Sequence, residues 1–230
     1  MKIIVKNTAL LLILLFSNSI AAQNAEDIIK EHLKVVNQDK LSKVETKVVK
    51  GTLFQSGVEV DLYIAQMRGD KMNQVLTFNG STHKVVFNTD KGWEKNQFAG
   101  HTEPQKFDAK KNMSMIISSD IDSKVATFLK LKGTYKLISV ENIGDKECYK
   151  ITFDVPNFGK EDLWFDKNDY TVRKSKDKSG IEKTYKGYSG FDDVLVPIET
   201  LIKLPSGDAK IIIKSVEYDV DLDESQFNVE

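Results

Sequence analysis

Residues 105–131, QKFDAKKNMSMIISSDIDSKVATFLKL, are the only clearly helical stretch in the interior of a chain that otherwise reads as a series of strands. The stretch contains two apolar groups separated by polar residues 118–120. Their spacing predicts two short helices with a break between them, and Asp122 or Ser123 is expected to cap the second helix. The first group consists of Met113, Ile116 and Ile117, and the second of Val125, Phe128, Leu129 and Leu131.

This helical stretch has two interpretations. Apolar residues at helical spacing are typical of core, and in that case the two helices plug the mouth of a sheet. Met113 and Met115 beside a polar break favour a lid that opens, because unbranched thioethers adapt to irregular ligands. The lid interpretation predicts an apolar cradle that can hold lipids.

The sequence on both sides of the helical stretch has a period of two, which is typical of strands with one buried face. In residues 58–65, VEVDLYIA, every second side chain is aliphatic, and Asn79-Gly80 is a strong hairpin signal. About eleven strands are predicted in one up-and-down order, after an N-terminal helix that Asn24 caps. A flat sheet of this width would leave its apolar face bare, so a barrel or a strongly curved half-barrel is favoured.

Six apolar residues are expected to share the cavity-facing side of this sheet. They are compatible with a ligand site and with an ordinary core. Together with the helical residues Met113, Ile116, Ile117, Val125, Phe128 and Leu129, they form the predicted hydrophobic cavity and lid. The six sheet residues are Leu62, Ile64, Leu76, Phe78, Val85 and Phe87.

The first residues indicate a compartment. Met1–Ala22 has a basic start, the apolar run ALLLILLF and small residues at its end, which is the layout of a cleavable secretory leader. The run is shorter than the ~20 residues of a bilayer span. No cysteine lies near the cleavage point, so we expect a soluble protein in an extracytoplasmic space, with residues 23–230 as a single domain.

Composition argues against several functions. The net charge is −1 and no basic cluster is visible, which disfavours nucleic-acid binding. Cys148 lies in an alternating stretch and shares no motif with His32, His83 or His101, so a thiol nucleophile is disfavoured. The histidines lack metal-ligand spacing. We therefore expect no catalytic residues, no metal and no cofactor.

Three short segments resemble the LolA/LolB-like superfamily of outer-membrane lipoprotein carriers. Residues 63–71, YIAQMRGDK, are similar to its strand ending in Lys-Arg-Pro-Asn, and residues 90–93, DKGW, to its Asp-Gly-Lys-x-x-Trp. Residues 222–229, LDESQFNV, are similar to its closing Asp-x-x-x-Phe segment. The resemblance spans essentially the whole chain after the leader. It implies a mainly β fold with some α-helix, in which about eleven antiparallel strands form an unclosed half-barrel under a helical lid.

The resemblance also implies a role for Arg68, which matches the arginine that keeps the lid shut in such carriers. Met67 and Gly69 stand where the family has Lys and Pro, and Gly69 changes the turn that would aim the side chain. Arg68 is therefore either the lid latch or a solvated strand end.

Two functions of different classes follow as expectations. The first is a monomeric periplasmic carrier or chaperone that holds acyl chains of lipoproteins or lipids and exchanges them with transfer proteins of the inner and outer membranes. The second is an envelope sensor or partner-binding module on the same fold, without transport. A hydrolase is disfavoured, because the motifs supply no triad and no carboxylate pair.

Overall fold

The structure is a computed structural model that describes residues 24–107 and 109–228. The expected leader, residues 1–22, lies outside the described part. In the two described ranges, no helix combines the length and the apolar character needed to cross a membrane.

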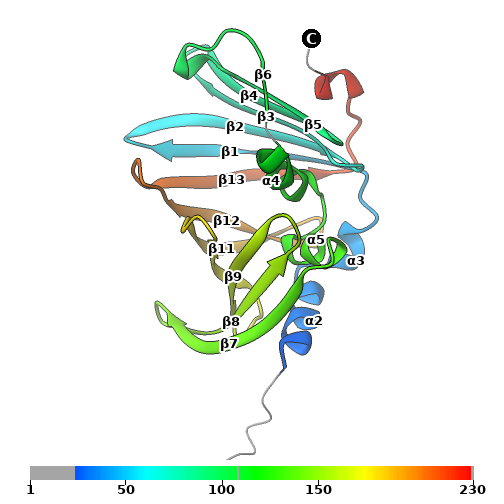
Figure 1. Ribbon diagram of the computed structural model, residues 1–230, viewed down its shortest axis with the longest axis vertical. Helices are drawn as coiled ribbons and strands as arrows, with labels where there is room; N and C mark the ends of the chain where they lie inside the picture. Colours follow the sequence, from blue (N-terminus) through cyan, green and yellow to red (C-terminus); the bar gives the residue numbers. More distant parts are fainter. Residues whose placement is uncertain (1–23, 108, 229–230) are drawn as a thin grey trace, which may run out of the picture.

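Strands predominate over helices in the described part of the chain (Figure 1). The helices are α2 (Ala25–Val35), α3 (Gln38–Leu41), α4 (Ala109–Ser119) and α5 (Lys124–Lys130), with the 3₁₀-helices η2 (Gln97–Ala99) and η3 (Glu224–Phe227). The strands are β1 (Thr46–Gln55), β2 (Val58–Met67), β3 (Lys71–Phe78), β4 (Ser81–Asn88), β5 (Lys91–Asn96), β6 (Gln105–Lys106), β7 (Thr134–Ile143), β8 (Lys146–Val155), β9 (Gly159–Asp166), β10 (Val172–Asp177), β11 (Glu182–Phe191), β12 (Val194–Lys203) and β13 (Ala209–Tyr218).

Local signals start the helices and turns where the sequence predicts them. The Asn24 side chain accepts a hydrogen bond from the Asp27 amide at 2.8 Å and caps α2. Ser123, rather than Asp122, caps α5, and its Oγ accepts from the Ala126 amide at 3.3 Å. At the β3–β4 hairpin, Asn79 and Gly80 have the positive φ values, 48° and 78°, that a two-residue turn requires.

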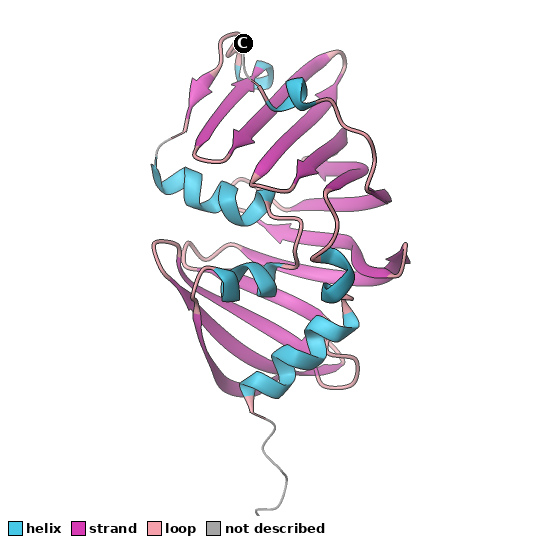
Figure 2. Cartoon of the chain, turned by 90° about the vertical axis from the view of Figure 1, so that its right-hand side faces the viewer, coloured by secondary structure: helices cyan, strands magenta, loops and turns pink. Residues whose placement is uncertain are grey.

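All thirteen strands belong to one antiparallel sheet with the order β6-β5-β4-β3-β2-β1-β13-β12-β11-β10-β9-β8-β7. The predicted open half-barrel is confirmed, with thirteen strands in place of about eleven. The single up-and-down order is wrong, because β1 pairs with β13 in the middle of the sheet and β6 and β7 form its edges. The segment with α4 and α5 therefore runs from one edge of the sheet to the other, across one face (Figures 1 and 2).

The helical stretch begins later than its sequence indicates. Gln105 and Lys106 pair with β5 as strand β6, so the helix starts at Ala109. The Phe107 amide donates to the Gly92 carbonyl at 2.9 Å, which keeps this backbone extended. A Cβ on Gly92 would lie 1.9 Å from the Phe107 ring, so only glycine lets the ring sit there.

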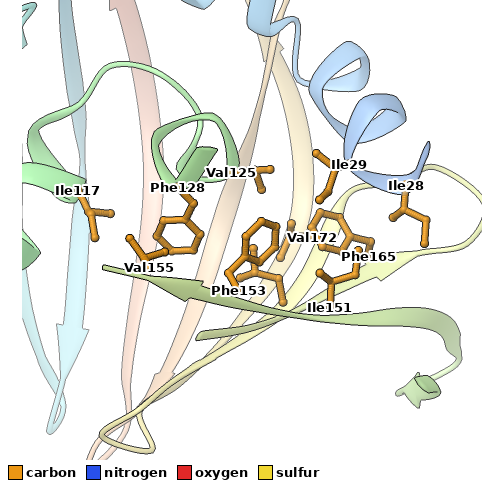
Figure 3. Packing of buried hydrophobic residues seen from close by; sticks show 11 residues of the cluster. Ile28, Ile29, Ile117, Val125, Phe128, Ile151, Phe153, Val155, Phe165 and Val172 are labelled. Carbon is orange, nitrogen blue, oxygen red and sulfur yellow. The ribbon is translucent and has the colours of Figure 1, made fainter. Parts of the chain in front are cut away.

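Two clusters fix the helices on the face that they cover. Helices α2 and α5 pack on β8, β9 and β10 around Phe128, Phe153 and Phe165 (Figure 3). Helix α4 covers β3 and β4, where Met72 and Phe87 are buried. Phe227 of η3 is buried with β1 and β2 residues that point to the opposite face of the sheet.

Candidate functional site

The register of β2, β3 and β4 places the six predicted sheet residues on the covered face. Leu62 lies opposite Leu76, and Ile64 lies opposite Gln74, which in turn lies opposite Val85. Because side chains alternate between faces, Phe78 and Phe87 belong to the same side. The sheet therefore brings these residues to one face, which we call the concave face.

Along this face the six residues differ in how deeply they lie. Val85 and Phe87 are buried and pack with Met115 and Ile116 of α4. Phe78, at the end of β3, is 37% exposed. The concave face is thus covered under α4 and open towards the β3–β4 turn.

The predicted residues of the two helices pack on different strands. Val125 and Phe128 are buried in the α5 cluster, and the Phe128 ring centroid lies 5.4 Å from that of Phe153. Ile117 of α4 joins this cluster, and Leu129 packs against it. Met113 is half-buried. In this closed arrangement, α5 contributes core to the sheet beneath it.

The break between α4 and α5 is tied to the end of β2. Gln66 Nε2 donates to the carbonyls of Ser118 at 2.8 Å and Asp120 at 3.1 Å. Gln66 is buried, so these two bonds are shielded from water. Gln66 was not among the predicted site residues, although an amide on the apolar face of β2 breaks the alternation of aliphatic side chains.

Arg68 contacts three segments at the same end of the sheet. Its Nη2 donates to the Leu41 carbonyl at 2.6 Å, and its Nε donates to the Val44 carbonyl at 2.7 Å. Towards the helical segment it forms a longer ion pair with Asp122 at 3.4 Å. The carboxyl pKa of Asp122 is lowered, because the opposing effect of burial is outweighed by Lys130 and Arg68.

A cavity of about 240 Å³ lies between these helices and the central strands. Most of its wall is aliphatic, and its polar groups come from both the helices and the sheet. The lining residues are His32, Val36, Leu41, Lys47, Ile121, Asp122, Ser123, Lys124, Val125, Leu163, Val172, Tyr185, Tyr188, Val194, Leu195, Val196, Pro197 and Tyr218.

The strands that line this cavity are not the strands β2, β3 and β4 that carry the predicted sheet residues. Of the twelve predicted cavity and lid residues, only Val125 lines it. The missed residues include Lys47 and Tyr218, which face each other across β1 and β13. The sequence does contain one signal for Lys47. Lys47, Val49 and Leu53 are separated by even numbers of residues, so their side chains lie on the same face of β1, and Lys47 places an ammonium on that apolar face.

A larger groove of about 510 Å³ lies along β4 and β5 on the other side of the sheet. The groove is lined by Thr82, Lys84 and Val86 of β4. These residues alternate along the strand with Val85 and Phe87, so their side chains lie on the face opposite to the concave face. Lys95 and Glu103 add further charge to its walls. The groove is therefore less suited to an apolar ligand than the cavity under the helices.

Neither metal nor thiol chemistry is suggested in the described ranges. No group of three or more His, Cys, Asp or Glu side chains there could hold a metal ion. Cys148 is buried, and burial raises its thiol pKa to about 11, which disfavours the reactive thiolate.

No family model matches the sequence, and neither does any curated protein. Solved structures do match the fold. A LolA superfamily protein from Nitrosomonas europaea superimposes with a TM-score of 0.61 at 12% identity, over 90% of this chain and 98% of that one. A DUF1329 family protein from Desulfovibrio piger gives 0.59 at 13% identity, over 87% of this chain and 97% of that one.

A third structure has the same extent of similarity. It is a Vibrio parahaemolyticus domain described as an outer membrane lipoprotein-sorting protein, with a TM-score of 0.57 at 12% identity, over 87% of this chain and 97% of that chain. Identities this low establish the fold alone. With its open antiparallel sheet and its helices across the concave face, the chain has the LolA-like fold.

Proposed function

We propose that this protein binds acyl chains of lipoproteins or lipids and carries them through the periplasm towards the outer membrane, without catalysing a reaction. The observation that carries the proposal is the apolar cavity between the helices and the concave face of an open half-barrel. The fold likeness to a domain described as a lipoprotein-sorting protein supports the same class of cargo. Transfer proteins of the two membranes would be the partners.

Burial of methylene groups supplies the affinity. Each CH₂ that moves from water into an apolar site contributes about 0.8 kcal/mol. The cavity volume, about 240 Å³, is below the roughly 300–1,000 Å³ of pockets for drug-sized ligands. The closed form therefore suits one short chain, and longer or multiple chains require α4 to move away and uncover Val85 and Phe87.

Extraction of the natural ligand tests this function. The protein is purified from the periplasm without detergent and examined by native mass spectrometry, followed by lipid extraction. We expect an added mass that fragments to acyl chains. Purified protein that carries no acyl chain and takes up none from a fluorescent fatty-acid analogue would contradict the proposal.

The edge strand β7 favours a second candidate, an envelope sensor or partner-binding module. In the described part of the chain, the outer edge of β7 pairs with no other strand. Tyr135, Ile138 and Val140 of this strand are exposed at 37%, 50% and 46%. An exposed apolar edge can accept a further strand from another protein. The same native spectra would then contain a partner protein that Ile138→Lys removes.

A further inference from the structure

The cavity under the helices contains two polar side chains whose needs the described residues do not meet. We infer that Lys47 and Tyr218 bind the carboxylate of a single-chain fatty acid, whose hydrocarbon tail lies along the aliphatic wall of the cavity. This inference rests on the proposed acyl-binding function and names its ligand class.

The sheet brings the two side chains together. Lys47 on β1 and Tyr218 on β13 are directly opposite each other in the antiparallel register, so their side chains leave the same face as neighbours. Both line the cavity. An ammonium and a hydroxyl that stand side by side match the two oxygens of one carboxylate.

Lys47 has neither a hydrogen bond nor an ion pair within the described ranges. The carboxylates nearest to its charge are occupied: Lys130 bonds Asp120 at 2.8 Å and Asp122 at 3.1 Å. Burial lowers the Lys47 pKa to about 8, against the opposing effects of Asp120 and Asp122. At neutral pH the side chain is still mostly protonated, and a bound carboxylate would compensate for its lost hydration.

The Tyr218 hydroxyl oxygen is buried and has no hydrogen-bond partner in the described part of the chain. Burial also raises the pKa of this hydroxyl, so it keeps its proton and can donate it. Buried tyrosine hydroxyls usually find a partner. A ligand oxygen between Lys47 and Tyr218 would supply one.

The other cavity groups point to a fatty acid in preference to a phospholipid. The cationic groups Lys124 and Lys47 share the cavity, but Lys124 is paired with Glu161. One free ammonium suits a carboxylate with a single charge. The small aliphatic volume likewise suits one chain rather than two.

Calorimetric titration at neutral pH with decanoate, decanol and decyl phosphate tests the assignment. Wild-type protein should bind decanoate more tightly than decanol, which lacks the charge. Lys47→Met should weaken decanoate about 10- to 100-fold and decanol less than about 2-fold. Tyr218→Phe, which removes only the hydroxyl, should weaken decanoate about 2- to 10-fold.

Lys50→Met is the matched control. Lys50 lies on the same strand but is exposed and pairs with Glu217 at 3.0 Å, so its loss should leave decanoate binding unchanged. Thermal melting gives a second readout. Lys47→Met should melt higher than wild type in the absence of ligand, because the variant no longer places an unpaired ammonium in a half-buried, apolar position. A lysine with a purely structural role would instead lower the melting temperature when replaced.

Three results would overturn the inference. Equal losses of decanoate and decanol in Lys47→Met would mean that the side chain shapes the cavity without binding the charge. Unchanged decanoate binding in that variant would remove Lys47 from the site. Tighter binding of decyl phosphate than of decanoate would reassign the site to a phosphate headgroup. A fourth result, in which wild type binds neither decanoate nor decanol, would contradict the proposed acyl-binding function and not only the assignment of Lys47 and Tyr218.

Discussion

His32 is buried between α2 and the sheet, where its Nδ1 donates to the Tyr170 carbonyl at 2.9 Å. Its ring meets Phe165 edge-on, with the centroids 5.1 Å apart. Because a carbonyl only accepts, this contact is compatible with a neutral ring that carries its proton on Nδ1. Burial lowers the His32 pKa from 6.5 to about 4, against the opposing effect of the Tyr170 bond.

This shift predicts a loss of stability in acid. Between pH 6.5 and 4 the unfolded chain binds a proton at His32 that the folded protein does not, so the free energy of unfolding rises with pH across this window. At about pH 4.5, His32 should cost about 2–3 kcal/mol relative to neutral pH. Urea unfolding of wild type and His32→Gln at both pH values measures the effect.

The glutamine variant keeps a neutral donor for the Tyr170 carbonyl but does not titrate. Carboxylates titrate alike in both proteins, so the difference between the two pH responses isolates His32. Identical responses would mean that His32 binds a proton as readily in the folded protein as in the unfolded chain.

Single residues were also where the sequence was least informative. Arg68 was singled out only because it matches the arginine of the carrier family's Lys-Arg-Pro-Asn segment. Lys47 was not recognised, because a lysine that points to the concave face can be identified only when it is known which β1 side chains lie on that face. The pairing of β1 with β2 and β13 establishes this. Gln66 was overlooked for the same reason. Its two bonds to the break between the helices depend on residues 52 and 54 positions away.

At the scale of elements, the segment that carries α4 and α5 is held by few polar contacts. Gln66 binds its backbone, and Arg68 reaches it through Asp122. We predict that Arg68→Leu raises hydrogen exchange across residues 112–131, because the ion pair that helps hold the break is lost. Gln66→Leu should raise exchange more narrowly, around residues 118–123. Mass spectrometry of exchanged peptides resolves both changes.

Arg173→Leu is the control for this experiment. Arg173 forms ion pairs with Asp166 at 3.0 Å and with Asp169, whereas Arg68 pairs with Asp122 in the break. Its removal should leave exchange in residues 112–131 unchanged while β7–β9 loosen. If Arg68→Leu also leaves that segment unchanged, then Arg68 serves only the Leu41 and Val44 carbonyls, and the latch must be abandoned.

Helix ends and turns followed local chemistry, and for that reason Asn24, Ser123 and Asn79-Gly80 could be identified from sequence. The start of α4 could not, because β6 exists only through its pairing with β5. Whether the helices act as a plug or as a lid also depends on tertiary packing, which the local sequence does not specify. Phe128 is fully buried, so α5 has the packing of a plug, whereas α4 lies over residues that could face a ligand.

For the whole molecule, the curved antiparallel sheet was predictable because period-two alternation runs through most of the chain. The order of the strands was not. Hairpin signals specify neighbours in sequence, and they leave open whether the first strand meets the last. That pairing, between β1 and β13, joins residues about 170 positions apart, as at Lys47 and Tyr218.

Gly51 tests the importance of this central pairing. A Cβ at Gly51 would lie 2.3 Å from the Ile212 carbonyl oxygen, next to a register shift between the two strands. Gly51→Ala should therefore lower the free energy of unfolding by about 1–3 kcal/mol. Gly190→Ala is the control, because a Cβ there meets nothing within 4 Å and should change stability little. Urea unfolding of both variants measures the difference, and equal stabilities would show that the strands can separate at this point without penalty.

The seam between β1 and β13 also has a consequence for biogenesis. Each half of the sheet, residues 46–106 and 134–218, is a local meander that can form as soon as its own hairpins are complete. In a protein secreted to the periplasm, as proposed here, the seam could not close until the last strand had crossed the inner membrane. Since Lys47 and Tyr218 face each other across this seam, the carboxylate pocket would be among the last features to mature. A chain that lacks β13 would then be unable to bind cargo, and only fully synthesised and folded molecules could be loaded.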